Sequence, residues 1–266
     1  MKIRLTTLFI IVLLASPTYS QTETCLHNLS HPDYQSIIQV VSSDTIVREY
    51  ILYIPANYDE ANATPLVINL HGFGDCAADY AETMGDFYDF NDLADQENFI
   101  VAYPQGAWRP DKEDTYWEPG DAGVDDLYDN DVYFLEQLVS DIASEFNVNM
   151  SKVFACGYSN GGMMAYSLAC HSSSLFSGIG VMSGALLDGE CTLDNPVPII
   201  KFHGIADFVL PYDGNQWYAS VNEVIDFWLT QNDIPENSLI STELNNGDVV
   251  RDEYFGETNN SCVTLY

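Results

Sequence analysis

The fold of this chain is decided by residues 153–164, whose sequence is VFACGYSNGGMM. Apolar residues lead into the segment GYSNG at 157–161, and small, helix-forming residues lead out of it. A strand, a sharp turn and a helix in this order are typical of a nucleophile elbow. Glycine is needed on both sides of Ser159 because the strained turn brings backbone too close for a Cβ atom. We therefore predict that Ser159 is a nucleophile held above the end of a buried strand.

A helix that begins directly after this serine points its first backbone N–H groups at the same turn. The N–H of Asn160 is therefore predicted to stabilise the oxyanion of a tetrahedral intermediate. The segment LHGFG at 70–74 follows another apolar strand and is predicted to supply a second donor, the backbone N–H of Phe73. We interpret His71 as a structural histidine that shapes this loop and not as a general base.

The segment HGIAD at 203–207 follows a further apolar strand. Asp207 comes after the serine in chain order, where folds with this elbow place the acid of their catalytic triad. Its predicted role is to orient a histidine and to stabilise the imidazolium ion. A single aspartate in a loop is usually a solvated turn residue, so Asp207 is chosen because of the strand before it and the elbow at Ser159.

Hydrophobic periodicity predicts alternating strands and helices over the rest of the chain. The segment 131–146 is amphipathic, and its inward residues are Val132, Leu135, Leu138, Val139 and Ile142. Helical segments are also predicted at 76–95, 161–170 and 216–231, and strands at 36–41, 45–55, 65–71, 99–103, 152–156, 178–182 and 198–203, with a final hairpin of 248–255 and 261–266. This alternation predicts an α/β fold with a mostly parallel central sheet and helices on both faces.

The segment 104–129 is long, polar and rich in Gly, Pro, Asp and Trp, so we predict a surface loop that carries function. It contains Trp108, Tyr116 and Trp117. These rings either cover an acyl-binding or sugar-binding cleft or anchor the loop to the sheet. The sequence leaves both interpretations open.

Residues 1–20 are predicted to be a secretory signal peptide, because Lys2 and Arg4 precede a short apolar run and small residues precede Gln21. The apolar run is too short to span a bilayer. The remaining residues, 21–266, have a length that is common for one α/β domain. We therefore expect a single catalytic domain secreted to an extracellular or periplasmic space without a membrane anchor.

The chain is strongly acidic, with 40 Asp and Glu residues and a formal net charge of −32. Removing the signal peptide takes away Lys2 and Arg4, which leaves six Lys and Arg residues and a net charge near −34. Such a surface repels nucleic acid and anionic membranes, so neither is expected as a partner. A salt-tolerant source and an ordinary secreted protein with an acidic face both remain open.

Six cysteines, all after the signal peptide, favour disulfides in an oxidising compartment. We predict the pair Cys170–Cys191, because both residues are expected near the end of the helix that follows the serine. The sequence does not choose among the fifteen possible pairings of six cysteines, and a free core thiol is one open interpretation of Cys156, which lies in a buried strand. No cysteine has the spacing of a metal ligand, and neither a metal nor a cofactor is expected.

Four motifs together resemble the secreted polyhydroxybutyrate depolymerase and feruloyl esterase family, which also includes acetylxylan esterases. They occur in this order: LHGFG (70–74), YPQG (103–106), GYSNGGMM (157–164) and HGIAD (203–207). The resemblance extends from about residue 48 to the end of the chain. It implies an α/β-hydrolase without a cofactor, in which Ser159 is the nucleophile, Asp207 the acid, and the turn after His71 the oxyanion loop.

The chain departs from that family at the catalytic histidine, which the family carries in a glycine-rich loop after the last strand. The five histidines here, all before Asp207, are His27, His31, His71, His171 and His203. His171 lies about three helical turns beyond the serine, ~18 Å at 1.5 Å per residue. His203 is expected to be committed to packing at a strand end.

Two explanations of the missing histidine compete, a truncated gene product and a degenerate hydrolase, and we favour truncation. The chain as written is expected to have very low activity, since a triad without one member keeps ~10³–10⁴-fold catalysis over water. A histidine encoded shortly after Tyr266 would support an enzyme, and an in-frame stop there would support loss of catalysis.

The expected function is hydrolysis of feruloyl or acetyl esters of plant cell-wall polysaccharide through an acyl-enzyme on Ser159. Depolymerisation of a polyhydroxybutyrate-type polyester is the second expectation. An alternative of another class is a secreted, non-catalytic binding protein that keeps the cleft but lacks the base. In each case the expected partner is an ester substrate, either linked to a polysaccharide or part of a polyester.

Overall fold

The computed structural model describes residues 34–41, 44–82, 90–109, 112–119, 128–187, 191–256 and 261–266. The predicted signal peptide at 1–20 lies outside the described residues, as do His27, His31 and Cys25. No helix within the described ranges is long and apolar enough to cross a membrane.

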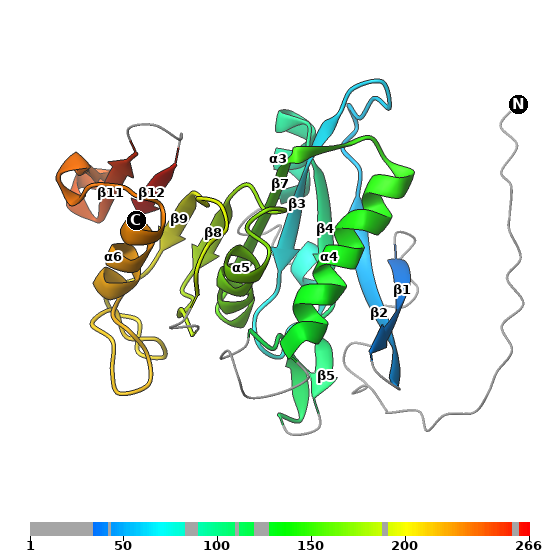
Figure 1. Cartoon of the computed structure of the whole chain (residues 1–266), viewed down its shortest axis with the longest axis horizontal. Helices are drawn as coiled ribbons and strands as arrows, with labels where there is room; N and C mark the ends of the chain where they lie inside the picture. Colours follow the sequence, from blue (N-terminus) through cyan, green and yellow to red (C-terminus); the bar gives the residue numbers. More distant parts are fainter. Residues whose placement is uncertain are drawn as a thin grey trace, which may run out of the picture.

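The described residues form an open ten-stranded sheet and a separate two-stranded hairpin (Figure 1). The spatial order of the large sheet is β1 (Tyr34–Val41), β2 (Asp44–Tyr53), β4 (Ile100–Pro104), β3 (Thr64–Leu70), β7 (Val148–Tyr158), β8 (Ile179–Met182), β9 (Ile199–Phe202), β12 (Cys262–Leu265), β11 (Val249–Phe255) and β10 (Ile240–Leu244). The strands from β4 to β12 in this order run parallel, and antiparallel strands extend the sheet at both ends. The predicted mostly parallel sheet is confirmed.

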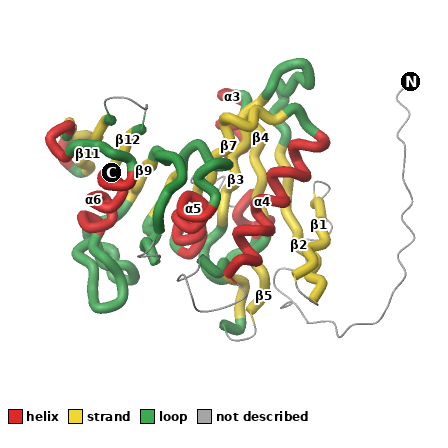
Figure 2. Tube along the Cα trace, in the orientation of Figure 1, coloured by secondary structure: helices red, strands yellow, loops and turns green. Residues whose placement is uncertain are grey.

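Helices lie on both faces of the sheet, and alternate residues of β4 belong to two separate cores. Ile100 and Ala102 belong to the larger core, whereas Val101 and Tyr103 belong to a smaller one. The larger core includes residues of α4 (Tyr128–Glu145), α5 (Asn160–His171) and α6 (Val221–Gln231), and the smaller one includes residues of α2 (Ala77–Glu82) and α3 (Phe90–Glu97). Figure 2 shows α4, α5 and α6 along one side of the sheet. The inward residues predicted for 131–146 are all buried in α4.

The parallel direction of the central strands brings three sequence motifs to one edge of the sheet. The loop at 71–74 follows β3, the serine turn follows β7, and the segment 203–207 follows β9. Since β3, β7, β8 and β9 are consecutive and parallel, all three turns lie at the carboxyl edge, where open α/β sheets bind ligands.

The predicted start of the last helix is wrong, because α6 begins at Val221 and not at residue 216. Ser220 caps the helix: its hydroxyl accepts a hydrogen bond from the N–H of Glu223 at 3.2 Å. The Glu223 carboxylate accepts one from the N–H of Ser220 at 2.7 Å. This capping box fixes the first helical residue at Val221, five residues after the predicted position.

Two strand features were also missed by hydrophobic periodicity. The strand β10 was not predicted, since its side chains are half-buried or exposed and give no clear alternation. The segment 104–129 contains an antiparallel hairpin of β5 (Ala107–Arg109) and β6 (Asp114–Tyr116), so it is not wholly a loop. Each of these two strands has only three residues, too few for a period of two to show.

The predicted disulfide between Cys170 and Cys191 is present, and it ties the last turn of α5 to the segment before β9. Cys76 is also disulfide-bonded, whereas Cys156 and Cys262 are free thiols. The Cys170–Cys191 bond closes a sequence separation of 21 residues. A cross-link of this span lowers the entropy of the unfolded chain.

Replacing both Cys170 and Cys191 by alanine is expected to lower the free energy of unfolding by about 3 kcal/mol, because the unfolded chain regains its loop entropy. Urea denaturation followed by circular dichroism measures the change. Cys262→Ser is the control for loss of a sulfur atom without loss of a cross-link. A loss no larger in the double variant than in this control would contradict the prediction.

Candidate active site

Ser159 lies between β7 and α5 in a strained backbone conformation, with φ 52° and ψ −117°. Its N–H donates to the carbonyl of Met182 at 2.9 Å, which anchors the turn to the end of β8. A Cβ atom on Gly157 would overlap the backbone of Gly161, and one on Gly161 would overlap the carbonyl of Leu70. The structure therefore has the strand, turn and helix of the predicted elbow, and glycine is required on both sides of the serine.

His71 is fully buried in the loop after β3 and is held as a neutral ring. Its Nδ1 donates to the carbonyl of Gly72 at 2.7 Å, and its Nε2 accepts from the N–H of Gly106 at 2.9 Å. Burial lowers the pKa of His71 to about 4, so the ring does not take up a proton near neutral pH. The prediction that His71 is structural is confirmed.

The two predicted oxyanion donors belong to segments in direct backbone contact. The close approach of Gly161 to Leu70 and His71 sets the first turn of α5 against the loop that carries Phe73. That loop is also tied to β6 and its neighbours, since the N–H of Gly74 donates to the carbonyl of Thr115 at 2.9 Å. The roles of Phe73 and Asn160 as oxyanion donors remain predictions.

Asp207 lies in the turn after β9 and accepts two backbone hydrogen bonds through Oδ1. The donors are the N–H groups of Val209 and Leu210, both at 2.9 Å. Partial burial by itself would raise the pKa of Asp207, but these donors outweigh it and hold the pKa below its ordinary value. Asp207 is therefore ionised at neutral pH, as an acid that orients a histidine must be.

The segment after β8 connects the nucleophile turn with the acid turn. Met182 accepts the N–H of Ser159, and the side chain of the next residue, Ser183, hydrogen-bonds to Asp207. Ser183 has φ 45°, a left-handed conformation that is costly for a residue with a side chain. The two predicted triad positions, Ser159 and Asp207, are thus linked through Met182 and the strained residue Ser183.

None of the three histidines in the described ranges is placed as the missing base. His203 donates from Nε2 to the carbonyl of Leu210 at 2.8 Å, and the same nitrogen is 3.7 Å from Asp207 Oδ2. Its ring is buried at the end of β9, as predicted, and burial lowers its pKa. His171 is the last residue of α5, at the opposite end of that helix from the serine.

A buried lysine below the acid turn was missed by the sequence analysis. Lys201, in β9, is 1% exposed, and its Nζ donates to the carbonyl of Gly184 at 2.8 Å. The Nζ atom also lies 5.5 Å from the centroid of the Tyr166 ring. Burial lowers the pKa of Lys201 to about 7, although the negative charge of Asp207 opposes that shift. The only signal in the sequence is a lysine within an otherwise apolar strand.

A buried ion cluster supports the segment after β4, and it too was missed. Asp131 of α4 is fully buried and accepts from Arg48 at 2.6 Å and from Arg109 at 2.8 Å. Its carboxylate also accepts the backbone N–H of Glu118 at 2.8 Å. Burial raises the pKa of Asp131, but the two arginines outweigh it and lower the pKa overall. The cluster holds β2, β5 and α4 together beneath the loop.

The aromatic rings of the segment 104–129 were predicted either to cover a cleft or to anchor the loop, and for Trp117 the second interpretation is right. Its side chain is fully buried, so it anchors the segment and does not line an open cleft. Phe73 and Tyr116, by contrast, pack edge to face with ring centroids 5.8 Å apart, and the Phe73 side chain is 48% exposed. This pair forms an aromatic surface between the loop after β3 and the hairpin strand β6.

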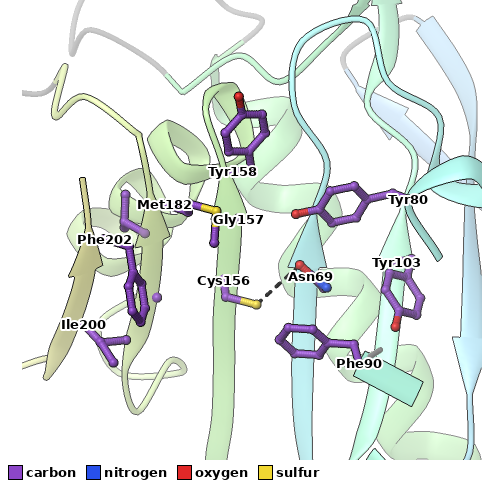
Figure 3. Close-up of a pocket in the computed structure, with 12 residues that line it drawn as sticks. Asn69, Tyr80, Phe90, Tyr103, Cys156, Gly157, Tyr158, Met182, Ile200 and Phe202 are labelled. Atoms are coloured by element: carbon purple, nitrogen blue, oxygen red, sulfur yellow. Dashed lines mark hydrogen bonds between the residues drawn. The ribbon is translucent and has the colours of Figure 1, made fainter. Parts of the chain in front are cut away.

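An apolar cavity of about 200 Å³ lies beside the elbow on the sheet face covered by α2 and α3 (Figure 3). Cys156, Tyr158, Met182 and Phe202 line it, whereas Ser159 and Asp207 do not. The Cys156 thiol is 3.4 Å from Asn69 Oδ1 (dashed line), and burial raises its pKa to about 12. The thiol is therefore protonated at neutral pH. In the described part of the chain no group of three His, Cys, Asp or Glu side chains is arranged to hold a metal ion.

A serine in a strained strand-to-helix turn, an aspartate at the same sheet edge and helices on both faces define the α/β-hydrolase fold. A solved structure agrees: the acetyl xylan esterase from Aspergillus awamori aligns with a TM-score of 0.60 at 15% identity, covering 87% of this chain and 91% of that one. At this identity the similarity concerns the fold.

The family model described as "Putative esterase" matches residues 47–232, and the chain belongs to this family. The chain is 31% identical over 177 residues to feruloyl esterase C of Emericella nidulans, covering 65% of this chain and 60% of that protein. It is 28% identical over 165 residues to a bifunctional acetylxylan esterase/xylanase of Neocallimastix patriciarum, covering 62% and 22% respectively. The chain thus spans less than two thirds of the length of these relatives.

Proposed function

We propose that the chain is the hydrolase domain of a secreted carboxylic ester hydrolase that forms an acyl-enzyme on Ser159. The observation that carries the proposal is the bridge over residues 182–183, which links the N–H of Ser159 to the carboxylate of Asp207. Membership of the esterase family supports the reaction type. The disulfide between Cys170 and Cys191 supports secretion, since such bonds persist in oxidising compartments.

In the proposed reaction the Ser159 hydroxyl oxygen attacks the ester carbonyl carbon while a base takes up the hydroxyl proton. The carbonyl electron pair moves to its oxygen, where the N–H groups of Phe73 and Asn160 stabilise the charge. Collapse of this intermediate expels the alcohol, which takes the proton back, and leaves the acyl group on Ser159. Water then repeats the sequence and releases the acid.

The proposed substrates are feruloyl or acetyl esters of plant cell-wall polysaccharide. The names of the curated relatives, a feruloyl esterase and an acetylxylan esterase/xylanase, support this class. The pair of exposed Phe73 and half-buried Tyr116 supports it independently, because an aromatic surface on the proposed oxyanion loop suits both a feruloyl ring and a sugar ring.

The proposed esterase activity is tested by adding imidazole to the solution as a substitute for the catalytic base. Imidazole added to the 266-residue chain is expected to restore part of the ~10²–10⁴-fold that a positioned base contributes. Methyl ferulate, acetylated xylan and a hydroxybutyrate oligomer serve as substrates, and the rate is followed against the concentration of neutral imidazole. Ser159→Ala is the matched control, since it retains the oxyanion donors and the spontaneous reaction with imidazole.

The proposal requires an imidazole-dependent rate that is larger in the parent chain than in Ser159→Ala. Without imidazole the two proteins are expected to differ little, because removing a second member of a triad that already lacks one costs little more. Equal imidazole dependence in both proteins would contradict the esterase. Saturable binding of acetylated xylan without hydrolysis would then support the non-catalytic alternative.

A further inference from the structure

The two proposed oxyanion donors come from distant parts of the sequence, so their spacing needs a structural device. Phe73 lies in the loop after β3, and Asn160 opens α5. An oxyanion hole works only when both N–H groups point at one oxygen position, about 2.7–3.1 Å from each donor. A link that fixes one segment to the other therefore acts directly on transition-state stabilisation.

The side chain of Asn160 begins such a link. It is 3% exposed, and it makes two hydrogen bonds to the backbone of Trp117. Its Oδ1 accepts the Trp117 N–H at 2.7 Å, and its Nδ2 donates to the Trp117 carbonyl at 2.9 Å. Both polar atoms of the amide are used on one residue, so the position of Trp117 is fixed relative to the start of α5.

The indole of Trp117 completes the link. It is fully buried, and its Nε1–H donates to the carbonyl of His71 at 3.0 Å. The His71 ring lies beside it, with centroids 5.1 Å apart, and is itself locked by the hydrogen bonds to Gly72 and Gly106. The bonded path therefore runs from Asn160 through Trp117 to a carbonyl two residues before Phe73.

We infer that Trp117 is a positioning residue for the oxyanion hole: with the Asn160 side chain it sets the distance between the two donors. The inference rests on the proposed function. Asn160 then contributes twice: its backbone N–H is an oxyanion donor, and its side chain holds the backbone of Trp117 by two hydrogen bonds. The polar side chain at this position, directly after the nucleophile, is explained by that second task.

The test is Trp117→Phe, which keeps an aromatic ring in the core but removes the donor to His71. In the imidazole-supported assay kcat is expected to fall about tenfold with KM within about twofold, because the lost alignment acts in the transition state and not on substrate binding. The matched control is Trp228→Phe. Trp228 is also fully buried, but its indole N–H has no acceptor among the described residues.

A stability loss of similar size in both variants, with kcat lowered only in Trp117→Phe, would support the inference. An unchanged kcat in Trp117→Phe, or an equal fall in Trp228→Phe, would overturn it. A fall expressed mainly in KM would overturn it as well.

Hydrogen exchange tests the proposed link between α5 and the oxyanion loop without a measurement of catalysis. The Gly74 amide, bonded to Thr115, reports on the oxyanion loop. Its exchange is expected to be at least about tenfold faster in Trp117→Phe and unchanged in Trp228→Phe. The esterase proposal fails if Ser159→Ala behaves like the parent chain, but hydrogen exchange still tests the structural link in that case. Faster exchange of the Gly74 amide in Trp117→Phe would support the link, and unchanged exchange would contradict it.

Discussion

Asp131→Ala is expected to lower the free energy of unfolding by about 3–5 kcal/mol, because it leaves two buried guanidinium groups without their shared carboxylate. Arg48 is 2% exposed and Arg109 6% exposed, so hydration by water cannot replace the lost carboxylate at either guanidinium group. The Glu118 N–H loses its acceptor at the same time. Urea denaturation at constant pH and salt measures the loss.

Two further variants separate the charge effect from packing. Glu145→Gln removes an exposed acid from the same helix and is expected to change stability by less than about 0.5 kcal/mol. The triple replacement of Arg48 and Arg109 by Met and Asp131 by Leu removes all three charges, and it is expected to recover most of the loss. If the triple variant were no more stable than Asp131→Ala, volume and not unpaired charge would be the cause.

Lys201→Met is expected to remove a pH dependence of the free energy of unfolding. In the parent chain this dependence amounts to about 1.4 kcal/mol per pH unit above neutrality. The pKa of Lys201 is lowered from 10.5 to about 7 in the folded chain. Between these values the unfolded chain binds a proton that the folded chain does not, so the free energy of unfolding rises with pH. The parent chain therefore gains stability relative to the variant as pH rises from 7 to 9, by about 2 kcal/mol.

The measurement is urea denaturation of both proteins at half-unit steps between pH 7 and pH 9. The upper limit avoids the titration of tyrosines. The groups around Lys201 are Asp207, whose charge favours the ammonium, His203 and Tyr166. Lys152→Met, an exposed lysine of β7, is the control for removing one positive charge. A constant difference between the parent chain and Lys201→Met at every pH would refute the prediction.

The parts of the site that were predicted correctly are those encoded within a few residues. The elbow at 157–161 shows in the sequence because its glycines, its strand and its helix are adjacent, and only that conformation needs all three. The structural nature of His71 and of His203 was also predicted, since both follow apolar strands at a sheet edge. Parallel strands then bring such turns together without further information.

The parts that were missed depend on pairs far apart in the chain. Asp131 looks like an ordinary acid in the first turn of a helix until Arg48, 83 residues earlier, is placed against it. The Asn160 side chain finds its partner 43 residues away in a segment predicted as loop. The buried surroundings of Lys201 include the carbonyl of Gly184, 17 residues earlier, and the ring of Tyr166 in α5. Local propensity carries no information on any of these contacts.

The backbone contact between Gly161 and β3 limits how this protein can be engineered. Main-chain atoms make this contact and leave no room for a Cβ atom on Gly161, so side-chain substitution cannot reshape the molecule at this point. Directed evolution of substrate range must therefore act on side chains of the elbow and the oxyanion loop, such as exposed Phe73 and Tyr158 and half-buried Tyr116. A mutant library restricted to these three positions samples new acyl groups while the reaction centre stays constant.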